Sequence, residues 1–177
     1  RSVGVPARFV GTPLWSDGSG NHSWVEIWDD GWHFTGAAEP TGDELDRAWF
    51  TGRASRASSE NPKNAIYAVT WRATPISFPM TWKPQDQSVQ AVDVTDRYTA
   101  GEVTIADGHA RVRFRVIDPE SKERKASSIT VYGEDSHLHF EGVSKDERFD
   151  GNHHLESQLE IGKHFVVIVE QEGGVTA

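Results

Sequence analysis

The sequence predicts a mainly β (α+β) fold in two parts: a sheet with one short helix over residues 1–90, and an antiparallel β-sandwich over residues 91–177. Short runs of β-branched and aromatic residues recur along the chain, and Gly, Pro, Ser and Asp are concentrated between them. Only one stretch has a helical pattern. Of the 177 residues, 36% are hydrophobic and 25% charged, a composition that can form a globular core.

The first three strands are expected at residues 7–10, 23–28 and 32–34. Residues 23–28 alternate Trp and Glu with Val and Ile, as a strand with two different faces does. The turn Asp29-Asp30-Gly31 separates the second strand from the third. These two strands are therefore expected to form a hairpin.

A short helix is expected after this hairpin. Thr41 or Asp43 could cap its N-terminus, and Gly52 could end it. The apolar residues of this helix are Leu45, Ala48, Trp49 and Phe50. Strand character returns at residues 64–71.

Three prolines, Pro75, Pro79 and Pro84, then indicate an irregular or edge-strand segment that ends near residue 90. The boundary between the two parts is expected at about residues 90–100, where the pattern becomes more regular.

The second part contains the most regular strand pattern of the chain. Within residues 110–118, apolar residues alternate with Arg111, Arg113 and Arg115, which predicts a strand with one apolar and one charged face. Similar runs follow at intervals typical of an antiparallel sandwich. They lie at residues 127–133, 137–143, 154–162 and 164–171.

Composition also excludes several classes of function. The formal net charge of −9 argues against a nucleic-acid-binding surface, which requires clustered Lys and Arg. No apolar run approaches the ~18 residues that a membrane span needs. The chain contains no Cys, so these residues supply no disulfide and no thiol nucleophile.

Three motifs occur in order near the N-terminus: Gly4-Val5-Pro6-Ala7-Arg8, then His22-Ser23-Trp24-Val25-Glu26-Ile27, then Gly31-Trp32. This succession resembles the transglutaminase-like superfamily of papain-type cysteine hydrolases. The resemblance implies a Cys-His-acid constellation in which the imidazole accepts the thiol proton and the acid orients the imidazole. By motif position, His22 would be the general base.

The resemblance also suggests the remaining site residues. The family places its acid four residues after the Trp that corresponds to Trp32, and here that position is Gly36. The nearest acid followed by Pro is Glu39, which we take as the candidate acid. Trp15 and Trp24 are the expected substrate contacts. No cofactor is expected.

The function implied is that of the His-bearing part of a cysteine hydrolase or acyl transferase acting on peptide or amide bonds. The Cys would lie in a segment before Arg1, because the chain begins where the Cys-bearing helix of the family ends. The expected partner is a peptide or protein substrate, or that upstream segment, and the expected location is extracellular, periplasmic or in the cell envelope. The second part resembles the prealbumin-like or carboxypeptidase-regulatory-like sandwiches that accompany secreted bacterial enzymes.

The alternative is a non-catalytic extracellular binding, adhesion or structural β-protein, in effect a pseudoenzyme. Its glycan-binding form requires an exposed aromatic platform made from Trp15, Trp24, Trp28 and Trp32. Its structural form predicts self-association through open sheet edges.

Metal binding is not expected, although two His-containing stretches raise the question. His137 and His139 are two residues apart on one expected strand, and residues 146–154 are rich in Asp, Glu, Asn and His. The second stretch lacks the ligand spacing of an EF-hand loop. It is better interpreted as a hydrophilic turn between strands.

Overall fold

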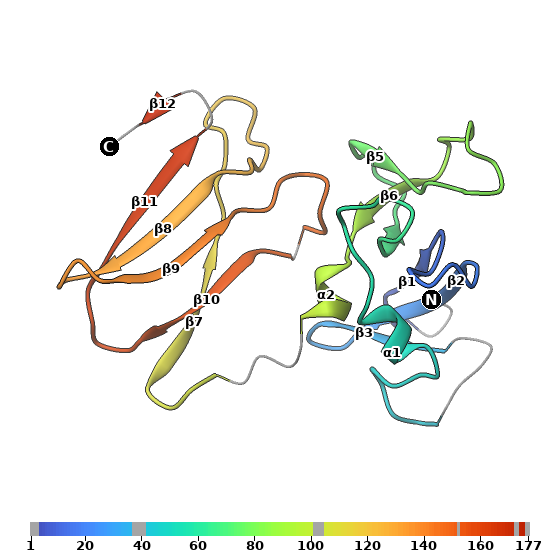
Figure 1. Ribbon diagram of the computed structural model, residues 1–177, viewed down its shortest axis with the longest axis horizontal. Helices are drawn as coiled ribbons and strands as arrows, with labels where there is room; N and C mark the ends of the chain where they lie inside the picture. The colour runs from blue at the N-terminus through green and yellow to red at the C-terminus, as the bar shows by residue number, and fades with distance from the viewer. Residues whose placement is uncertain (1–3, 37–41, 101–104, 152, 172–173, 176–177) are drawn as a thin grey trace. The chain divides into compact units, whose positions relative to one another are not determined.

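A computed structural model shows two compact units, Arg1–Gly101 and Glu102–Ala177. The fold is mainly β, as predicted, with antiparallel sheets and two short helices (Figure 1). The division between the units lies next to the expected range of about residues 90–100, and β6 (Gln90–Asp93) pairs with strands of the first unit. The structure describes all residues except 1–3, 37–41, 101–104, 152, 172–173 and 176–177.

The first unit contains a six-stranded sheet with the strand order β3-β2-β1-β4-β6-β5. All of its neighbouring strands are antiparallel. The strands are β1 (Ala7–Thr12), β2 (His22–Trp28), β3 (Trp32–Thr35), β4 (Tyr67–Val69), β5 (Ile76–Ser77) and β6. The three strands predicted before residue 35 are thus confirmed, and β2 and β3 form the predicted hairpin.

This sheet carries a hydrophobic cluster on each face. Val10 lies opposite both Trp24 and Ala68, so these three side chains share one face and join the larger cluster. Tyr67 lies on the other face, where it packs in a smaller cluster with Phe78. The first face is the one that carries His22, because His22 and Trp24 are two residues apart on β2.

The predicted helix around Ala48 and Phe50 is wrong in position. Helix α1 (Thr51–Ala54) begins where the predicted helix was expected to end. The reason lies at Asp46, which has a left-handed φ of 60° and donates its backbone N–H to the Phe34 carbonyl at 2.9 Å. Asp46 is therefore bonded to the edge of the sheet and does not continue a helix toward Phe50. A second short helix, α2 (Asp96–Thr99), was not predicted.

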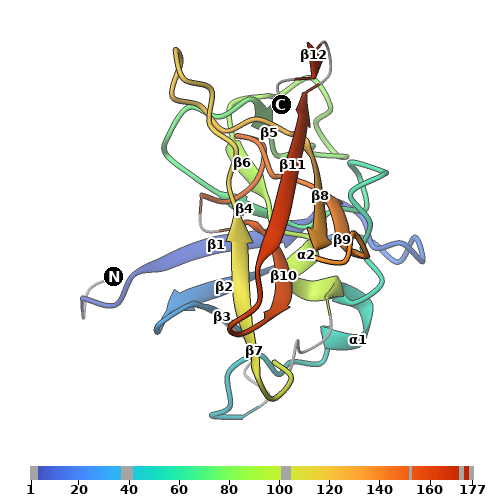
Figure 2. The same ribbon diagram turned by 90° about the vertical axis from the view of Figure 1, so that its left-hand side faces the viewer.

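The second unit contains two antiparallel sheets. One pairs β7 (His109–Phe114) with β10 (Leu155–Glu160), and the other has the order β12-β11-β8-β9 (Figure 2). The strands of the larger sheet are β8 (Ser128–Gly133), β9 (Leu138–Val143), β11 (Phe165–Gln171) and β12 (Gly174–Val175).

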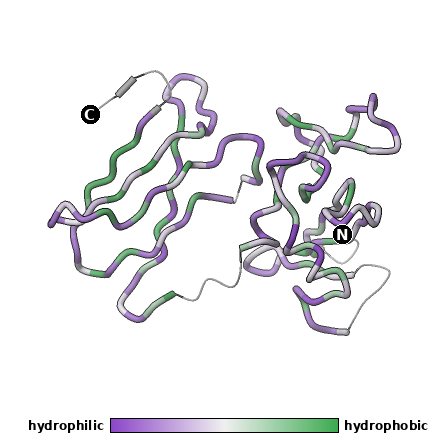
Figure 3. Tube along the Cα trace, viewed as in Figure 1, coloured by the Kyte–Doolittle hydropathy of each residue, from purple (hydrophilic) through white to green (hydrophobic). Residues whose placement is uncertain are grey.

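Both sheets of the second unit contribute to one hydrophobic cluster. Ile129 and Val131 of β8 pack in it with Leu159 of β10, and Phe114 of β7 stacks on Phe140 of β9 at 5.9 Å between ring centroids. Hydrophobic segments recur along these strands (Figure 3). No helix among the described residues is long and apolar enough to cross a membrane.

Candidate functional site

His22 is the first residue of β2 and lies opposite Thr12 of β1. It is only partly buried, whereas Trp24, two residues further on, is fully buried. The two strands approach closely here: a Cβ atom at Gly11 would lie 2.8 Å from the His22 carbonyl oxygen. The His22 backbone can lie this close to β1 because glycine at position 11 has no side chain.

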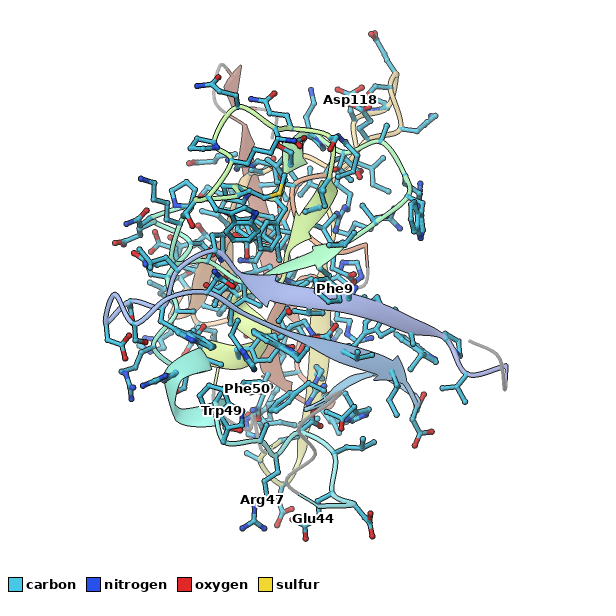
Figure 4. The ribbon with its side chains drawn as sticks, turned by 90° about the vertical axis from the view of Figure 1, so that its right-hand side faces the viewer. Phe9, Glu44, Arg47, Trp49, Phe50 and Asp118 are labelled. Carbon is cyan, nitrogen blue, oxygen red and sulfur yellow. The ribbon has the colours of Figure 1, made fainter. Side chains whose placement is uncertain are left out.

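Aromatic rings surround the His22 imidazole. The centroid of the Trp49 ring lies 4.7 Å from that of His22, and the centroid of Phe50 lies 5.0 Å away. The rings of Trp24 and Trp15 follow at 5.9 and 6.1 Å. Trp49 and Phe50 lie together beside α1 (Figure 4). His22 thus has an apolar environment on several sides and still reaches the surface.

The two tryptophans named as substrate contacts are core residues in this structure. Trp15 is 3% exposed and Trp24 0% exposed, and their rings stack in parallel at 6.1 Å. Their assignment to substrate binding stays a prediction.

The aromatic platform of the glycan-binding alternative requires rings that are both exposed and coplanar. Trp28 and Trp32 meet at 80°, so these four tryptophans do not form that platform.

The exposed ring beside His22 is instead Trp49, which is 50% exposed. Sequence reasoning assigned Trp49 to the apolar side of a helix and did not connect it with His22. No local signal could have done so, because the contact depends on how the segment before α1 folds back on β2.

A buried carboxylate lies on the same face of β2. Glu26 is 1% exposed and accepts a hydrogen bond from Arg8 Nε at 2.5 Å. The Tyr98 hydroxyl donates to Glu26 Oε1 at 2.7 Å and accepts from Trp24 Nε1 at 2.7 Å. Glu26 therefore has both a counter-charge and a hydroxyl donor, which a buried carboxylate requires.

The ionisation of Tyr98 is suppressed in this environment. Burial raises the pKa of the Tyr98 hydroxyl well above its usual value, and the negative charge of Glu26 raises it further. Tyr98 consequently stays protonated and can donate to Glu26 while it holds the Trp24 indole. This hydroxyl links the carboxylate to the aromatic cluster around His22.

Two arginines link this network to β3. The Arg8 guanidinium lies 4.1 Å from the centroid of the Trp32 ring, a cation–π distance, and Arg97 of α2 donates to the Trp32 carbonyl. Arg97 Nε also lies 3.6 Å from Glu26 Oε1. The motif residues Arg8, Glu26 and Trp32 are therefore in direct contact with one another or with shared partners.

A second histidine, His33, pairs with a carboxylate on the outer side of β3. Its Nδ1 lies 2.5 Å from Asp46 Oδ2, and its Nε2 lies 3.1 Å from the Asp29 carbonyl oxygen. Both partners are acceptors, so the doubly protonated imidazolium satisfies both contacts. The hydrogen bond to Asp46 raises the pKa of His33 above its usual value.

Asp46 also holds the backbone of β3. Its Oδ1 accepts the Phe34 N–H at 2.9 Å, and its own N–H donates to the Phe34 carbonyl at 2.9 Å. Asp46 thereby binds both backbone groups of Phe34 at the sheet edge, three residues before Trp49. Sequence reasoning did not identify this residue, since an Asp in an acidic loop carries no distinctive signal.

The candidate acid Glu39 lies outside the described residues. Gly36, which occupies the position of the family acid, is buried and has no side-chain group that could orient an imidazole.

The described residues contain no group of three or more His, Cys, Asp and Glu side chains that could hold a metal ion. His137 and His139 do lie close, with ring centroids 5.8 Å apart. The loop over residues 146–153 is organised by a buried arginine instead. Arg124, 5% exposed, donates to the carbonyls of Phe149, Asp150 and His153 at 2.6, 3.0 and 3.2 Å.

A family model of the transglutaminase-like superfamily matches residues 1–36. The matched stretch spans β1, β2 and β3 and contains His22, whereas Glu39 lies beyond its end. The resemblance that the three motifs indicate is therefore confirmed over this part of the chain. No curated protein and no solved structure matches the chain.

Proposed function

We propose that this chain carries the general-base histidine, His22, of a transglutaminase-like cysteine hydrolase or acyl transferase acting on peptide or amide bonds. The observation that carries the proposal is that the superfamily match covers residues 1–36 and contains His22. Residues 1–177 include no Cys, so another polypeptide segment must supply the thiol.

The surroundings of His22 support this role. An imidazole that accepts a proton from a thiol must be held in one orientation and must remain accessible to that thiol. The rings of Trp24 and Phe50 restrict the His22 ring. The residue is partly exposed but its Nε2 atom is buried, so the thiol would approach the Nδ1 atom. The attack of the thiolate on an amide carbonyl would give an acyl-thioester, and the imidazolium would return its proton to the departing amine.

The orienting acid of this proposal is Glu39, which follows β3 in the chain as the acid does in the family. The proposed location is extracellular or in the cell envelope, as the resemblance implies.

The experiment uses the protein as isolated from its native source, with any segment or partner that accompanies it. A chloroacetamide probe should label one cysteine, and His22→Ala should slow this labelling by about 10²-fold or more, because general-base assistance typically contributes that much. Trp71→Ala is the matched control, since Trp71 is 89% exposed and belongs to the same unit.

Two results would overturn the proposal. One is a native protein in which no accompanying cysteine reacts with the probe. The other is an unchanged labelling rate in the His22→Ala variant, with circular dichroism showing that the variant is folded.

A further inference from the structure

Strand β7 has an open edge. Among the described strands it pairs only with β10, with Phe114 opposite Leu155 and His109 opposite Glu160. An unpaired strand edge presents backbone N–H and C=O groups that can pair with another extended chain.

The direction of the backbone groups identifies the residues that face this open edge. The Gly108 carbonyl accepts a hydrogen bond from the Ile161 N–H at 2.8 Å, so Gly108 directs its backbone toward the β10 side. Backbone direction alternates along a strand, so residues 110, 112 and 114 face β10 as well. The backbones of Arg111 and Arg113 therefore face the open edge.

The side chains of these same residues form a positive stripe. Arg111, Arg113 and Arg115 are exposed and point away from the hydrophobic cluster that contains Val112 and Phe114. Glu156 contacts both Arg111 and Arg113, at 3.5 and 2.8 Å. One carboxylate thus faces two guanidinium groups, and Arg115 forms no ion pair within the described part of the chain.

The pKa of the neighbouring His154 is lowered, in part by this excess of positive charge. Burial lowers the pKa of His154, and the charges of Arg124, Arg113 and Arg115 lower it further, although Glu156 acts in the opposite direction. The stripe is locally cationic in a chain whose net charge is −9. An acidic ligand would be repelled by most of the molecule and attracted here.

We propose that the open edge of β7 binds an extended acidic segment of a partner protein by strand addition. Residues of the added strand opposite Arg111, Arg113 and Arg115 share the face of these side chains, so acidic residues at alternate positions complement the stripe. The intervening residues lie on the same side as Val112 and Phe114 and are apolar. The recognised pattern is therefore acidic and apolar residues in alternation.

The test titrates the full chain with a capped heptapeptide in which three aspartates alternate with valines. Binding should shift the backbone amide signals of residues 109–115 and should weaken as NaCl is raised from about 50 mM to about 500 mM, because salt screens exposed charges. The triple variant Arg111→Gln/Arg113→Gln/Arg115→Gln should bind about tenfold more weakly, as expected for the loss of three cross-strand ion pairs.

The matched control removes three exposed arginines of the first unit, in the variant Arg47→Gln/Arg56→Gln/Arg72→Gln. It carries the same change in net charge and should bind as the unaltered chain does. Equal losses in the two triple variants would overturn the proposal, because net charge alone would then explain binding.

Two further peptides test the two halves of the mechanism. A peptide with asparagines in place of the aspartates should lose binding, and so should one with backbone N-methyl groups on the residues that pair with Arg111 and Arg113. Undiminished binding of the N-methylated peptide would exclude strand addition. Absence of binding by the parent peptide would overturn the proposal as a whole.

Discussion

Each unit has a charged side chain at most 5% exposed, Glu26 in the first and Arg124 in the second, and the two charges are satisfied in different ways. In the first unit, the Glu26 carboxylate accepts hydrogen bonds from the Arg8 guanidinium and the Tyr98 hydroxyl. In the second unit, the Arg124 guanidinium donates mainly to backbone carbonyls, and its acidic neighbour Glu147 has a side chain that is 42% exposed. The first arrangement fixes side chains around His22, whereas the second fixes the path of a loop.

This difference predicts how much stability each unit loses when Glu26 or Arg124 is replaced. Loss of the Glu26 charge removes a counter-ion of Arg8, whose side chain is 10% exposed, and this is costly in a medium of low polarity. Loss of Arg124 leaves carbonyl groups without a donor, and a loop can turn such groups toward water. Substitutions in the first unit should therefore be the more destabilising.

The largest effect is expected for Glu26→Gln, which removes the charge but keeps the size of the side chain. It should lower the free energy of unfolding by about 3–5 kcal/mol, because Arg8, whose side chain is 10% exposed, loses its Glu26 counter-ion. Urea titration followed by fluorescence measures this. The double variant Glu26→Leu/Arg8→Met should recover much of the loss. A Glu26→Gln protein as stable as the unaltered chain would contradict the role given to this pair.

A smaller effect is expected for Arg124→Met in the second unit. Carbonyls of the loop over residues 149–153 lose their donor, at a cost of about 2 kcal/mol. Hydrogen exchange should speed up in this loop but not in β8. Arg148→Met is the control, because Arg148 is exposed and pairs with Asp146 at the surface. Uniform loss of protection over the whole unit would show that Arg124 supports more than the loop.

The third prediction concerns the close approach of strands beside His22. A Cβ atom at position 11 would lie 2.8 Å from the His22 carbonyl oxygen, so Gly11→Ala must displace β2. We expect destabilisation of about 1–2 kcal/mol, as for other overpacked sites. Imidazole NMR signals of His22 should move more than those of His33. Gly52→Ala is the control, since its added Cβ meets no atom within 4 Å.

The smallest effect is expected for the exposed pair of His33 and Asp46. The folded-state pKa of His33 is raised, so the stability from this pair is present in full below the unfolded value of about 6.5. It is lost as the pH rises through the raised folded-state pKa. The side chains are 35% and 47% exposed, so solvent screening limits the effect to about 1 kcal/mol or less.

The variant Asp46→Asn tests this pair directly. Its free energy of unfolding should change less between pH 5.5 and pH 8.5 than that of the unaltered chain. Since Asp46 also anchors the segment that carries Trp49, tryptophan fluorescence should change in the same variant. An unaltered pH dependence would show that the pair adds nothing to stability.

Much of the strand content was predictable because alternation and turn residues are local properties. Residues 23–28 alternate, the turn at Asp29-Asp30-Gly31 follows, and the structure has β2 and β3 on either side of it. The segment before α1 was not predictable in the same way. Its apolar residues fit a helix, but Asp46 bonds to Phe34, and that competing contact joins residues of different elements.

In the candidate site, too, local motifs were predictable from the sequence, whereas burial was not. The three ordered motifs were sufficient to identify His22 and the superfamily that the first 36 residues match. They did not distinguish buried from exposed tryptophans. An alternating strand indicates which residues share a face but not which face is covered, and Trp15 and Trp24 proved to be core residues.

The sequence by itself determined the β-rich class, the absence of a thiol within residues 1–177, the motif position of His22, and the separation of apolar from arginine side chains on β7. Only the tertiary structure decided that Trp49 lies against His22, that the buried Glu26 bonds to Arg8 and Tyr98, and that β7 pairs only with β10 among the described strands. The physical reason is that strand periodicity arises from each residue's own backbone. Burial, pairing and open edges depend on segments that meet only when the chain folds.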